Sequence, residues 1–361
     1  MSSPVARDLS APSLPREVDV LVVGAGQAGL GVAQQLRRRQ IDVLVVDALL
    51  VGESWRERWD SLQLFTPRRF SGLPGLRFPG GPTRSPSRTE MAHYLERYVE
   101  HFDLPVRTGV RVERLTREVS GFCAETPDGP IHAQQVVLAT GPFRRPFVPA
   151  AGHDLDPAVT QMHSFTYRRP GDLPPGDVLV VGGGNSAAQL ALELAQTHRV
   201  TVAGPGELWF LPEDILGVSM YWWTLLTGVL NAGAEAWIAR YIRRRGDAIV
   251  GTQLRALIAE GRVRLVPHRV VAAHGRSVEL ADGTVLAVSS VLWCTGFRPD
   301  TDWIAIEGAL DPTGAPLHDK GAAPVPGLHW MGLPWQTRLN SSIIDGVDRD
   351  ARRTAARIVA G

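Results

Sequence analysis

Two glycine-rich motifs limit what this chain of 361 residues can fold into more than any other feature. Residues 24–29 read GAGQAG and residues 182–187 read GGGNSA. Each motif follows a β-branched run, residues 18–23 and 178–181, and opens onto an apolar-periodic stretch that is typical of a helix. In such a unit the first glycine makes a tight turn, the second lets the backbone approach a pyrophosphate, and the third position lets helix pack on strand. The sequence therefore predicts two dinucleotide sites, each with its pyrophosphate at a helix N-terminus.

An acidic residue distinguishes the first motif from the second. Asp47 ends the apolar run 43–46, about 20 residues after the first motif, where a carboxylate accepts hydrogen bonds from a ribose hydroxyl. The alternative is that Asp47 only ends a strand as a turn residue. A carboxylate at the corresponding strand end of the second motif would repel the 2′-phosphate of NADP. Residues 200–204 carry none, so the second site permits NADPH.

The order of strand and helix patterns predicts an α/β fold with parallel sheets. Two strand patterns that end in a small-residue turn, residues 136–141 (VVLATG) and 291–297 (VLWCTGF), bracket the second motif. The economical interpretation is two Rossmann-like dinucleotide-binding domains, the second inserted into the first. Residues 17–148 plus 290–361 would form the first domain, and residues 149–289 the second.

Composition excludes several classes of function. A net charge of +1 gives no reason to expect nucleic acid or an anionic surface as a partner. The two cysteines, Cys123 and Cys294, form no C-x-x-C pair and have no zinc-binding spacing, so we predict neither a redox disulfide nor a metal site. The motifs H-E-x-x-H and G-x-S-x-G are also absent, which argues against zinc proteases and serine hydrolases.

Two further segments bear on cellular location. Residues 1–16 are rich in Ser, Pro and Ala without an apolar signal-peptide core, and are predicted to be a disordered leader. Residues 215–234 carry no charge and approach the length of a bilayer span, about 20 residues. Their glycines and polar residues favour a buried or substrate-lining helix over interfacial attachment or a true span. The sequence therefore favours a cytoplasmic protein without membrane contact.

The paired motifs, the paired small-residue turns and residues 163–167 (HSFTY) between them resemble the flavin-containing monooxygenase family. Residues 52–62 (GESWRERWDSL) resemble the flavin-contacting loop of its short bacterial and YUCCA-like members, and residues 332–336 (GLPWQ) resemble their C-terminal segment. The resemblance covers nearly the whole chain from Val18 on. It implies FAD at the first motif and NADPH at the second.

The resemblance also implies which residues contact the cofactors, position by position in the matching motifs. The implied FAD contacts are Gly24, Gly26, Gly29, Asp47, Trp55 and Arg56; the turns between the domains are Thr140, Gly141, Thr295 and Gly296; the implied contacts of the nicotinamide cofactor are Gly182, Gly184, Asn185, Ser186 and Ala187.

In this family the nicotinamide cofactor reduces FAD, and O2 then adds to give a C4a-hydroperoxyflavin. One oxygen atom passes to a small organic substrate, which is a soft nitrogen or sulfur nucleophile or, in YUCCA-like members, a keto acid. The catalytic candidates are Asn185, His163 and Tyr167. Asn185 would donate a hydrogen bond near the flavin or only shape the helix N-terminus. His163 would be a hinge contact or a structural histidine, and Tyr167 favours the monooxygenases over Baeyer–Villiger relatives, which usually end this motif in tryptophan.

The chain departs from the family in three places. Residues 203–207 (AGPGE) lack the arginine that clamps the 2′-phosphate in many relatives, so NADH is not excluded. Phe65 stands where animal-type members carry an asparagine. Residues 332–333 lack the G-D pair of the disulfide reductases, which argues against that chemistry. The remaining alternatives are a Baeyer–Villiger-type oxygenase and an NAD(P)H-dependent reductase or electron carrier. The sequence predicts neither the substrate nor the oligomeric state.

Overall fold

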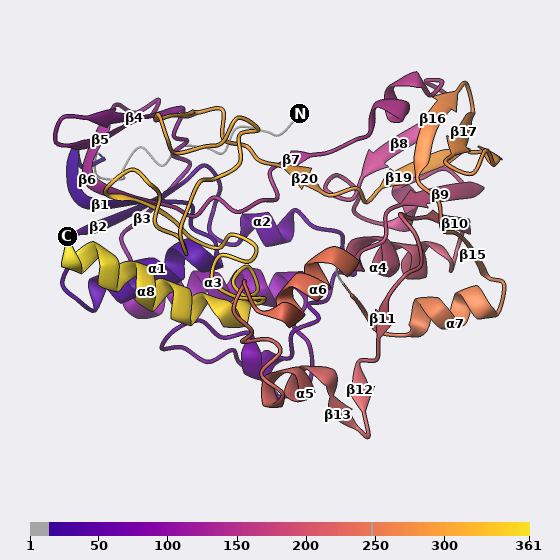
Figure 1. The fold of residues 1–361 in the computed structure, drawn as a ribbon, viewed down its shortest axis with the longest axis horizontal. Coiled ribbons are helices and arrows are strands. Elements are labelled where there is room, and N and C mark those ends of the chain that lie inside the picture. The colour runs from indigo at the N-terminus through magenta and orange to yellow at the C-terminus, as the bar shows by residue number, and fades with distance from the viewer. Residues whose placement is uncertain (1–13, 247) are drawn as a thin grey trace.

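The computed structural model describes residues 14–246 and 248–361 and places two β-sheets at opposite ends of an elongated molecule (Figure 1). Within these residues the first sheet has eight strands in the order β21-β4-β5-β6-β1-β2-β3, with β22 also paired to β6. Its centre is parallel, whereas β4, β5 and β6 form an antiparallel meander. The strands are β1 (Glu17–Val23), β2 (Val43–Asp47), β3 (Val106–Thr108), β4 (Arg114–Glu118), β5 (Gly121–Glu125), β6 (Ile131–Leu138), β21 (Ile304–Ala305) and β22 (Leu328–Trp330).

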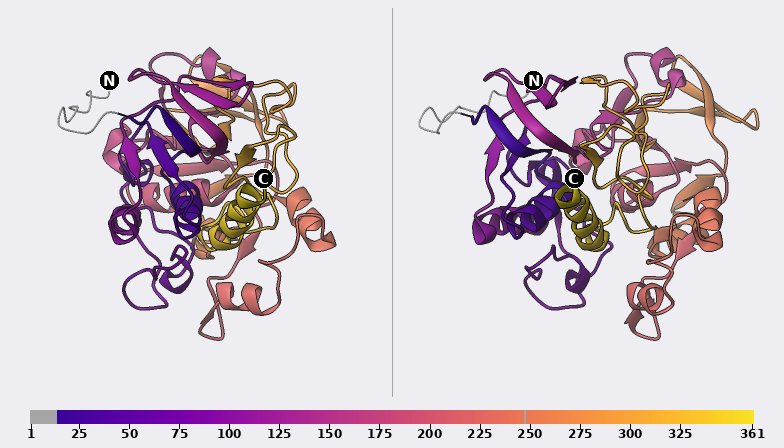
Figure 2. Two further views of the ribbon diagram at one scale, coloured as in Figure 1. Left: turned by 90° about the vertical axis from the view of Figure 1, so that its left-hand side faces the viewer. Right: turned by 60° about the vertical axis from the view of Figure 1, so that its left-hand side comes forward.

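Helices cover one face of the first sheet, as Figure 2 shows from two further sides. α1 (Gln27–Arg37) packs on α8 (Val347–Ala360) and on α3 (Arg88–Phe102), and the short α2 (Glu53–Arg56) packs on α3. Apolar side chains of these helices and of β1 and β2 form one buried core. A second core lies on the other face of the sheet, among β4, β5, β6 and the segment around β21. Because both faces are covered at the centre of the sheet, β2 and the ends of β1 and β6 are apolar on both sides.

The second sheet is parallel throughout, with the order β15-β10-β9-β19-β8. α4 (Asn185–Leu194) and α7 (Gln253–Ala259) pack on one face, and an antiparallel sheet of β16, β17 and β18 packs on the other. This architecture confirms the predicted α/β fold with two Rossmann-like units. The bounds are β8 (Thr160–His163), β9 (Asp177–Val181), β10 (Arg199–Ala203), β15 (Val263–Val266), β16 (Val270–His274), β17 (Ser277–Leu280), β18 (Val285–Ala287) and β19 (Ser290–Trp293).

The pairing of β19 differs from the predicted boundary at residue 290. We placed this strand at the start of the returning part of the first domain, but it lies between β8 and β9 in the second sheet. The physical reason is that a fully buried strand pairs on both sides, and its two partners there are far away in the sequence. The chain leaves the second sheet only after Trp293. The division of the chain into domains otherwise stays a prediction.

Two segments cross between the sheets and pair with each other. β7 (Arg145–Pro146) leads out and β20 (Phe297–Arg298) leads back, in antiparallel register. The amide of Phe147 donates to the carbonyl of Gly296 at 3.0 Å, and the Thr295 hydroxyl donates to the carbonyl of Phe147. The two crossings are therefore joined by hydrogen bonds from both residues of the second small-residue turn, Thr295 and Gly296.

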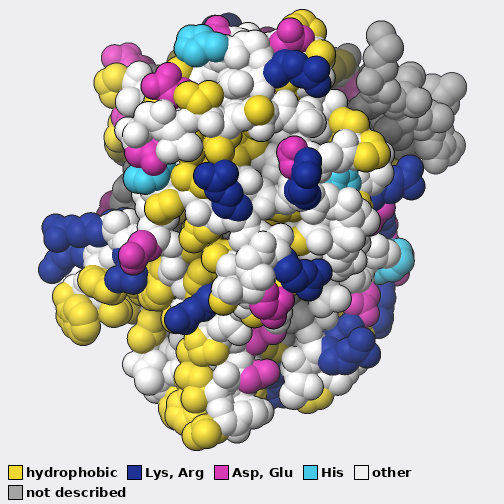
Figure 3. Space-filling model, turned by 90° about the vertical axis from the view of Figure 1, so that its right-hand side faces the viewer, with side chains coloured by type: hydrophobic (Ala, Val, Ile, Leu, Met, Phe, Trp, Pro, Cys, Tyr) yellow, Lys and Arg dark blue, Asp and Glu magenta, His cyan; other side chains and the backbone are white. Residues whose placement is uncertain are grey.

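The charge-free segment 215–234, predicted as a buried or substrate-lining helix, is not one continuous helix, and its contact with a substrate stays a prediction. It forms the end of a hairpin, β12 (Asp214–Ile215) and β13 (Val218–Ser219), and then α5 (Met220–Leu226). Leu216 is 92% exposed and Trp222 is 42% exposed, whereas Tyr221 is buried. Figure 3, which views the molecule from the right-hand side of Figure 1, shows hydrophobic side chains gathered at the lower end of that side. β11 (Phe210–Leu211) precedes the segment, and α6 (Trp237–Arg245) and β14 (Ile249–Val250) follow it. The 3-10 turns of the described residues are Arg68–Phe70, Ala150–Asp154, Pro170–Asp172 and Ile344–Gly346.

The structure tests the predicted leader and the predicted lack of a membrane span only in part. Most of the predicted leader, residues 1–13, lies outside the described residues, and Leu14 packs against the core around β4 to β6. Among the helices of the described residues, none combines the length and the apolar character that a membrane crossing requires.

Candidate functional site

The first glycine motif forms the turn between β1 and α1. Gly24 has φ +113°, and a Cβ there would lie 2.5 Å from the carbonyl oxygen of Ala139, just before the small-residue turn. A Cβ at Gly29 would lie 1.8 Å from the carbonyl oxygen of Gly24. Packing therefore requires glycine at both positions. At Gly26, by contrast, a Cβ would meet no described atom within 4 Å. The middle glycine keeps open the space that a pyrophosphate needs.

The second motif repeats this arrangement between β9 and α4. A Cβ at Gly182 would lie 2.4 Å from the carbonyl oxygen of Cys294, which precedes Thr295 and Gly296 as Ala139 precedes Thr140 and Gly141; the φ of Gly182 is +149°. A Cβ at Gly184 would meet no described atom within 4 Å, and Ala187 at the third position is buried. Each motif is thus backed by one of the two small-residue turns.

Both helices begin in the same way at their open glycine. Gly26 and Gly184 are the N-caps of α1 and α4, both with extended backbone at ψ −175°. In the described structure neither helix has a side-chain cap or an acidic residue in its first turn. Helix N-termini without caps leave N–H groups and a positive dipole end for an anion. The residues present therefore fit two dinucleotide pyrophosphates.

Asp47 lies at the tip of β2 beside the first turn. One carboxylate oxygen accepts the amide of Ala25 at 2.7 Å and the other accepts the amide of Leu49 at 2.8 Å, while the Arg144 guanidinium is 3.8 Å away. A carboxylate has about four lone-pair sites, so these contacts leave acceptor capacity for a ribose. The geometry supports the predicted role of Asp47 and also ties its side chain to the glycine loop.

Trp55 and Arg56, on α2, have different surroundings. Trp55 packs against the α1–α3 core of the first sheet and against the core around α4, so it lies between the two units. Arg56 donates to Glu96 at 2.6 Å and lies 3.6 Å from Glu53. Its guanidinium is therefore engaged by two acids of the protein, and its predicted contact with FAD stays a prediction.

His163 links the second sheet to the returning crossing. Its Nδ1 accepts the amide of Phe165 at 3.1 Å, which leaves the proton on Nε2 for the carbonyl of Gly296 at 3.1 Å. Burial lowers the pKa of this imidazole, the hydrogen bond to Gly296 opposes that shift, and the nearby charge of Arg58 adds to it. A neutral histidine with a hydrogen bond at each ring nitrogen, placed between the second sheet and the returning crossing, is consistent with the predicted hinge role.

Asn185 and Tyr167 both make contacts that support structure. The Asn185 amide donates to the carbonyl of Ala248 and accepts the amide of Val250, both at 2.9 Å, so it fastens β14 to the start of α4. Tyr167 is fully buried and its hydroxyl donates to Glu193 at 2.9 Å; burial raises its pKa. Both contacts favour the structural alternatives, and the catalytic roles of these residues remain untested predictions.

Arg58 is a candidate that the motifs did not single out. Its guanidinium carbon lies 5.3 Å from the ring centroid of Phe143 and 5.6 Å from those of Phe165 and Phe297. Burial lowers its pKa to about 10, and it forms no ion pair within the described residues. Phe297 directly follows the second small-residue turn, Phe143 comes two residues after the first, and Phe165 comes two residues after His163. The three rings come from distant segments, so no local pattern could have revealed them.

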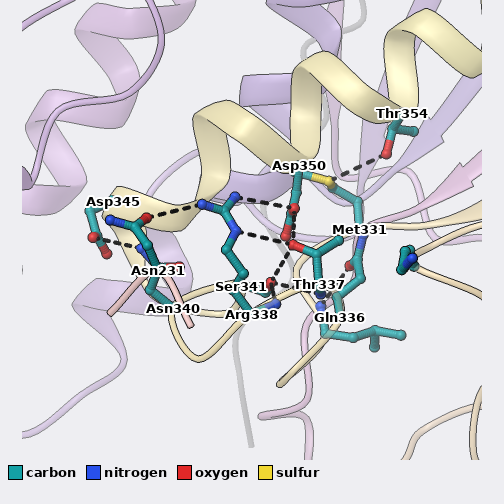
Figure 4. Close-up of polar contacts among 12 residues, drawn as sticks. Asn231, Met331, Gln336, Thr337, Arg338, Asn340, Ser341, Asp345, Asp350 and Thr354 are labelled. Atoms are coloured by element: carbon teal, nitrogen blue, oxygen red, sulfur yellow. Dashed lines mark hydrogen bonds and ion pairs between the residues drawn. The ribbon is translucent and has the colours of Figure 1, made fainter. Parts of the chain in front are cut away.

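The segment after β22 closes the first unit and contacts the second. A Cβ at Gly332 would lie 2.7 Å from the Cβ of Ala28, so this segment lies directly on the start of α1. Figure 4 shows the polar cluster that follows it. Arg338 is only 7% exposed; it donates to Asn231 at 3.1 Å and lies 3.8 Å from Asp350 on α8. This buried charge pair fixes the 215–234 segment against the C-terminal helix.

Known proteins show the same organisation. Residues 21–226 match the family model described as pyridine nucleotide-disulphide oxidoreductase. The chain is 41% identical over 335 residues to an uncharacterized oxidoreductase, CzcO-like, of Geobacillus kaustophilus (strain HTA426), covering 92% of this chain and 96% of that protein. It is 26% identical to the probable indole-3-pyruvate monooxygenase YUCCA7 of Arabidopsis thaliana, covering 87% of this chain and 82% of that protein.

A solved structure extends this similarity to three dimensions. The flavin-containing monooxygenase from Stenotrophomonas maltophilia superimposes with a TM-score of 0.81 at 29% identity, covering 96% of this chain and 99% of that one. The matches confirm the predicted cofactor pair, FAD and a pyridine nucleotide. The chain therefore belongs to the pyridine nucleotide-disulphide oxidoreductase family and is an oxidoreductase that is similar in sequence and structure to flavin-containing monooxygenases.

Proposed function

We propose that this protein is a flavin monooxygenase that uses NADPH, FAD and O2 to oxygenate a small organic molecule. The observation that carries the proposal is the pair of open glycine turns, each backed by its own small-residue turn, with His163 and the paired crossings between them. The relatives named as flavin-containing and indole-3-pyruvate monooxygenases support it.

Each part of the site has a binding task in this proposal. The N-terminus of α1 and Asp47 would hold FAD, and the N-terminus of α4 with Ser186 would hold the nicotinamide cofactor. Bound FAD supplies hydride acceptance and the activation of O2, which are the cofactor's own chemistry. Trp55 and the three phenylalanines around Arg58 place apolar surface between the units, where they would keep water from the reacting atoms.

The choice of NADPH over NADH would rest on Arg245. The loop after β10 has no arginine and exposes Glu207, so it offers no guanidinium of its own for a 2′-phosphate. Arg245, at the end of α6, lies over the ring of Trp209, with its guanidinium carbon 5.1 Å from the ring centroid. Ala248, three residues further along the chain, accepts a hydrogen bond from Asn185 at the start of α4, so we infer that Arg245 can reach a 2′-phosphate of a nucleotide at the second turn. A guanidinium there can bind a phosphate with two hydrogen bonds.

The substrate is proposed to be a soft nitrogen or sulfur nucleophile or a keto acid. The unpaired charge of Arg58 favours a molecule with an anionic group, since a desolvated guanidinium gains most from a carboxylate. A keto acid is then the first substrate to try. Disulfide reduction is disfavoured, because Cys123 is on β5 and Cys294 follows β19, in different sheets.

The experiment supplies the FAD-loaded enzyme with NADPH, 18O2 and a panel of amines, sulfides and keto acids. We expect NADPH consumption that rises with one class of substrate and one 18O atom in its product. NADPH oxidation that yields only hydrogen peroxide with every compound would support the reductase alternative instead. Replacing Arg58 with methionine should raise the KM of an anionic substrate by about tenfold and leave that of a neutral sulfide unchanged.

A further inference from the structure

The antiparallel meander of the first sheet carries three chemically distinct side chains on one face. Phe122 and Ala124 of β5 point into the core, so the alternation of a strand places Cys123 on the other face. Cys123 is paired in register with His132 of β6. Glu118, at the end of β4, joins them, and its carboxylate lies 2.9 Å from Nδ1 of His132. Three neighbouring strands thus each contribute one ligand-type atom.

The distances among these three atoms suit one small cation. The carboxylate oxygen, the sulfur and the ring nitrogen all lie within 4.8 Å of one another. Zinc bonds of about 2.0–2.3 Å in a tetrahedron would place such atoms about 3.3–3.7 Å apart. A modest rotation of the Cys123 or Glu118 side chain would bring the three atoms to the spacing of zinc ligands. Imidazole, thiolate and carboxylate are also the donors that Zn²⁺ takes, and three of them leave a fourth position for water.

Access and charge at this place also suit a cation. The side chains of Glu118 and His132 are 42% and 44% exposed, whereas Cys123 is 9% exposed and lies beneath them. The carboxylates of Glu118 and Glu125 place negative charge near the Cys123 sulfur. A divalent ion would offset this negative charge, and it could enter from solvent without any rearrangement of the backbone.

We propose that Glu118, Cys123 and His132 bind a single divalent cation of the zinc type, which ties the three strands of the meander together. As the sulfur–metal bond forms, the thiol proton passes to solvent. The proposal is independent of the monooxygenase activity, because the meander lies at the end of the molecule away from the second sheet (Figure 1). Yet β6 begins at this site and ends at the turn that backs Gly24, so the ion would stiffen a strand of the first unit.

Cobalt is the probe that tests this proposal, since Co²⁺ occupies zinc sites and reports a bound thiolate by its charge-transfer absorption. The FAD-loaded protein, treated with chelator, is titrated with Co²⁺ and followed by difference spectra. We expect one equivalent, a sulfur-to-cobalt band, and release of Co²⁺ on addition of Zn²⁺. In C123S the band should vanish, and in E118Q and H132Q the affinity should fall by about 10- to 100-fold. These two residues are half-exposed, so their variants should fold even if C123S does not.

Controls separate this site from others in the chain. E125Q removes a neighbouring charge but no ligand, so it should keep one equivalent and the full band. Excess Zn²⁺ should raise the Tm of the unaltered protein by about 2–5 °C and leave that of H132Q unchanged. A spectrum without a thiolate band, or one that persists in C123S, would overturn the proposal. So would equal affinity in E118Q, H132Q and the unaltered protein.

Discussion

The two glycine turns share a backbone design but differ in what surrounds them. α1 is buried along all nine residues from 28 to 36, between the first sheet, α3 and α8. α4 is buried on one face only, and Gln189 and Glu193 of its other residues remain accessible. The first turn also has the carboxylate of Asp47 and the overlying Gly332, whereas the second is contacted by the loop after β10 and has no carboxylate at the end of that strand. Enclosure suits a cofactor that stays bound, and openness suits one that exchanges in every catalytic cycle.

The largest expected effect tests whether both turns need their first glycine. In Gly24→Ala and Gly182→Ala the new Cβ would lie 2.5 and 2.4 Å from a carbonyl oxygen. We expect each substitution to lower the free energy of unfolding by about 2–4 kcal/mol, measured by chemical denaturation. Gly129→Ala is the matched control, because φ there is +112° and a Cβ would meet no described atom within 4 Å. An equal effect in all three variants would mean that the close backbone approach is unimportant.

Substitutions of the middle glycines should affect the two cofactors one at a time. In Gly26→Val and Gly184→Val the side chain would enter open space, so the fold should persist while the nucleotide is blocked. Gly26→Val should be purified without FAD. Gly184→Val should keep FAD, but its reduction by NADPH should slow by about 100-fold in stopped-flow measurements. Loss of FAD from Gly184→Val would contradict the assignment of the second turn.

The acid of the first turn should affect only FAD. Asp47→Asn removes the charge that accepts the amide of Ala25, and with it a charged acceptor for the ribose. The Kd of FAD, measured by fluorescence titration of the apoprotein, should rise about tenfold. Asp42→Asn, an exposed neighbour at the start of the same strand, should leave it unchanged. A change in the KM of NADPH without one in FAD affinity would reverse the assignment of the two sites.

A smaller effect is expected at the mouth of the second turn. Arg245→Ala should raise the KM of NADPH about fivefold and leave that of NADH unchanged, because only NADPH carries the 2′-phosphate. Arg244→Ala, one residue earlier on the same helix, is the control. If both variants behave alike, the phosphate is recognised elsewhere.

The last prediction concerns the pH dependence of stability and a histidine of the first unit. Burial lowers the pKa of His329 on β22 to about 4, and the charge of Arg357 adds to the shift. Between pH 4 and the unfolded value of about 6.5 the unfolded chain binds a proton that the folded chain does not, so stability falls as pH falls. His329→Gln should reduce this loss by up to about 1.4 kcal/mol per pH unit in denaturation curves. An unchanged slope would show that His329 is already charged in the folded protein.

Local sequence patterns predicted those parts of the candidate site that are formed by residues close together in the sequence. The spacing of Gly24, Gly26 and Gly29 specifies one turn, and the acid after the next apolar run specifies Asp47, because strand, turn and helix are continuous in the sequence. The α/β fold and the family followed from the same residues. Features that depend on the pairing of strands far apart in the sequence were predicted less well. β19 was placed in the wrong sheet, since its partners β8 and β9 are more than a hundred residues away.

The side chains that carry the proposals have the same explanation. The rings around Arg58 come from three segments, and the proposed cation site of Glu118, Cys123 and His132 depends on strand register rather than on spacing. The segment 215–234 was predicted correctly only in part. Its lack of charge favoured a buried or substrate-lining helix, but the structure leaves Leu216 and Trp222 exposed on a hairpin and a short helix.

The paired crossings limit how the two halves of the molecule can move. β7 and β20 are hydrogen-bonded to each other, and His163 holds the returning one to the second sheet. A single tether would permit swivelling in every direction, but two bonded tethers form a short ribbon that bends easily only about one axis. We therefore expect the paired crossings to restrict twisting between the two units more than a single connection would.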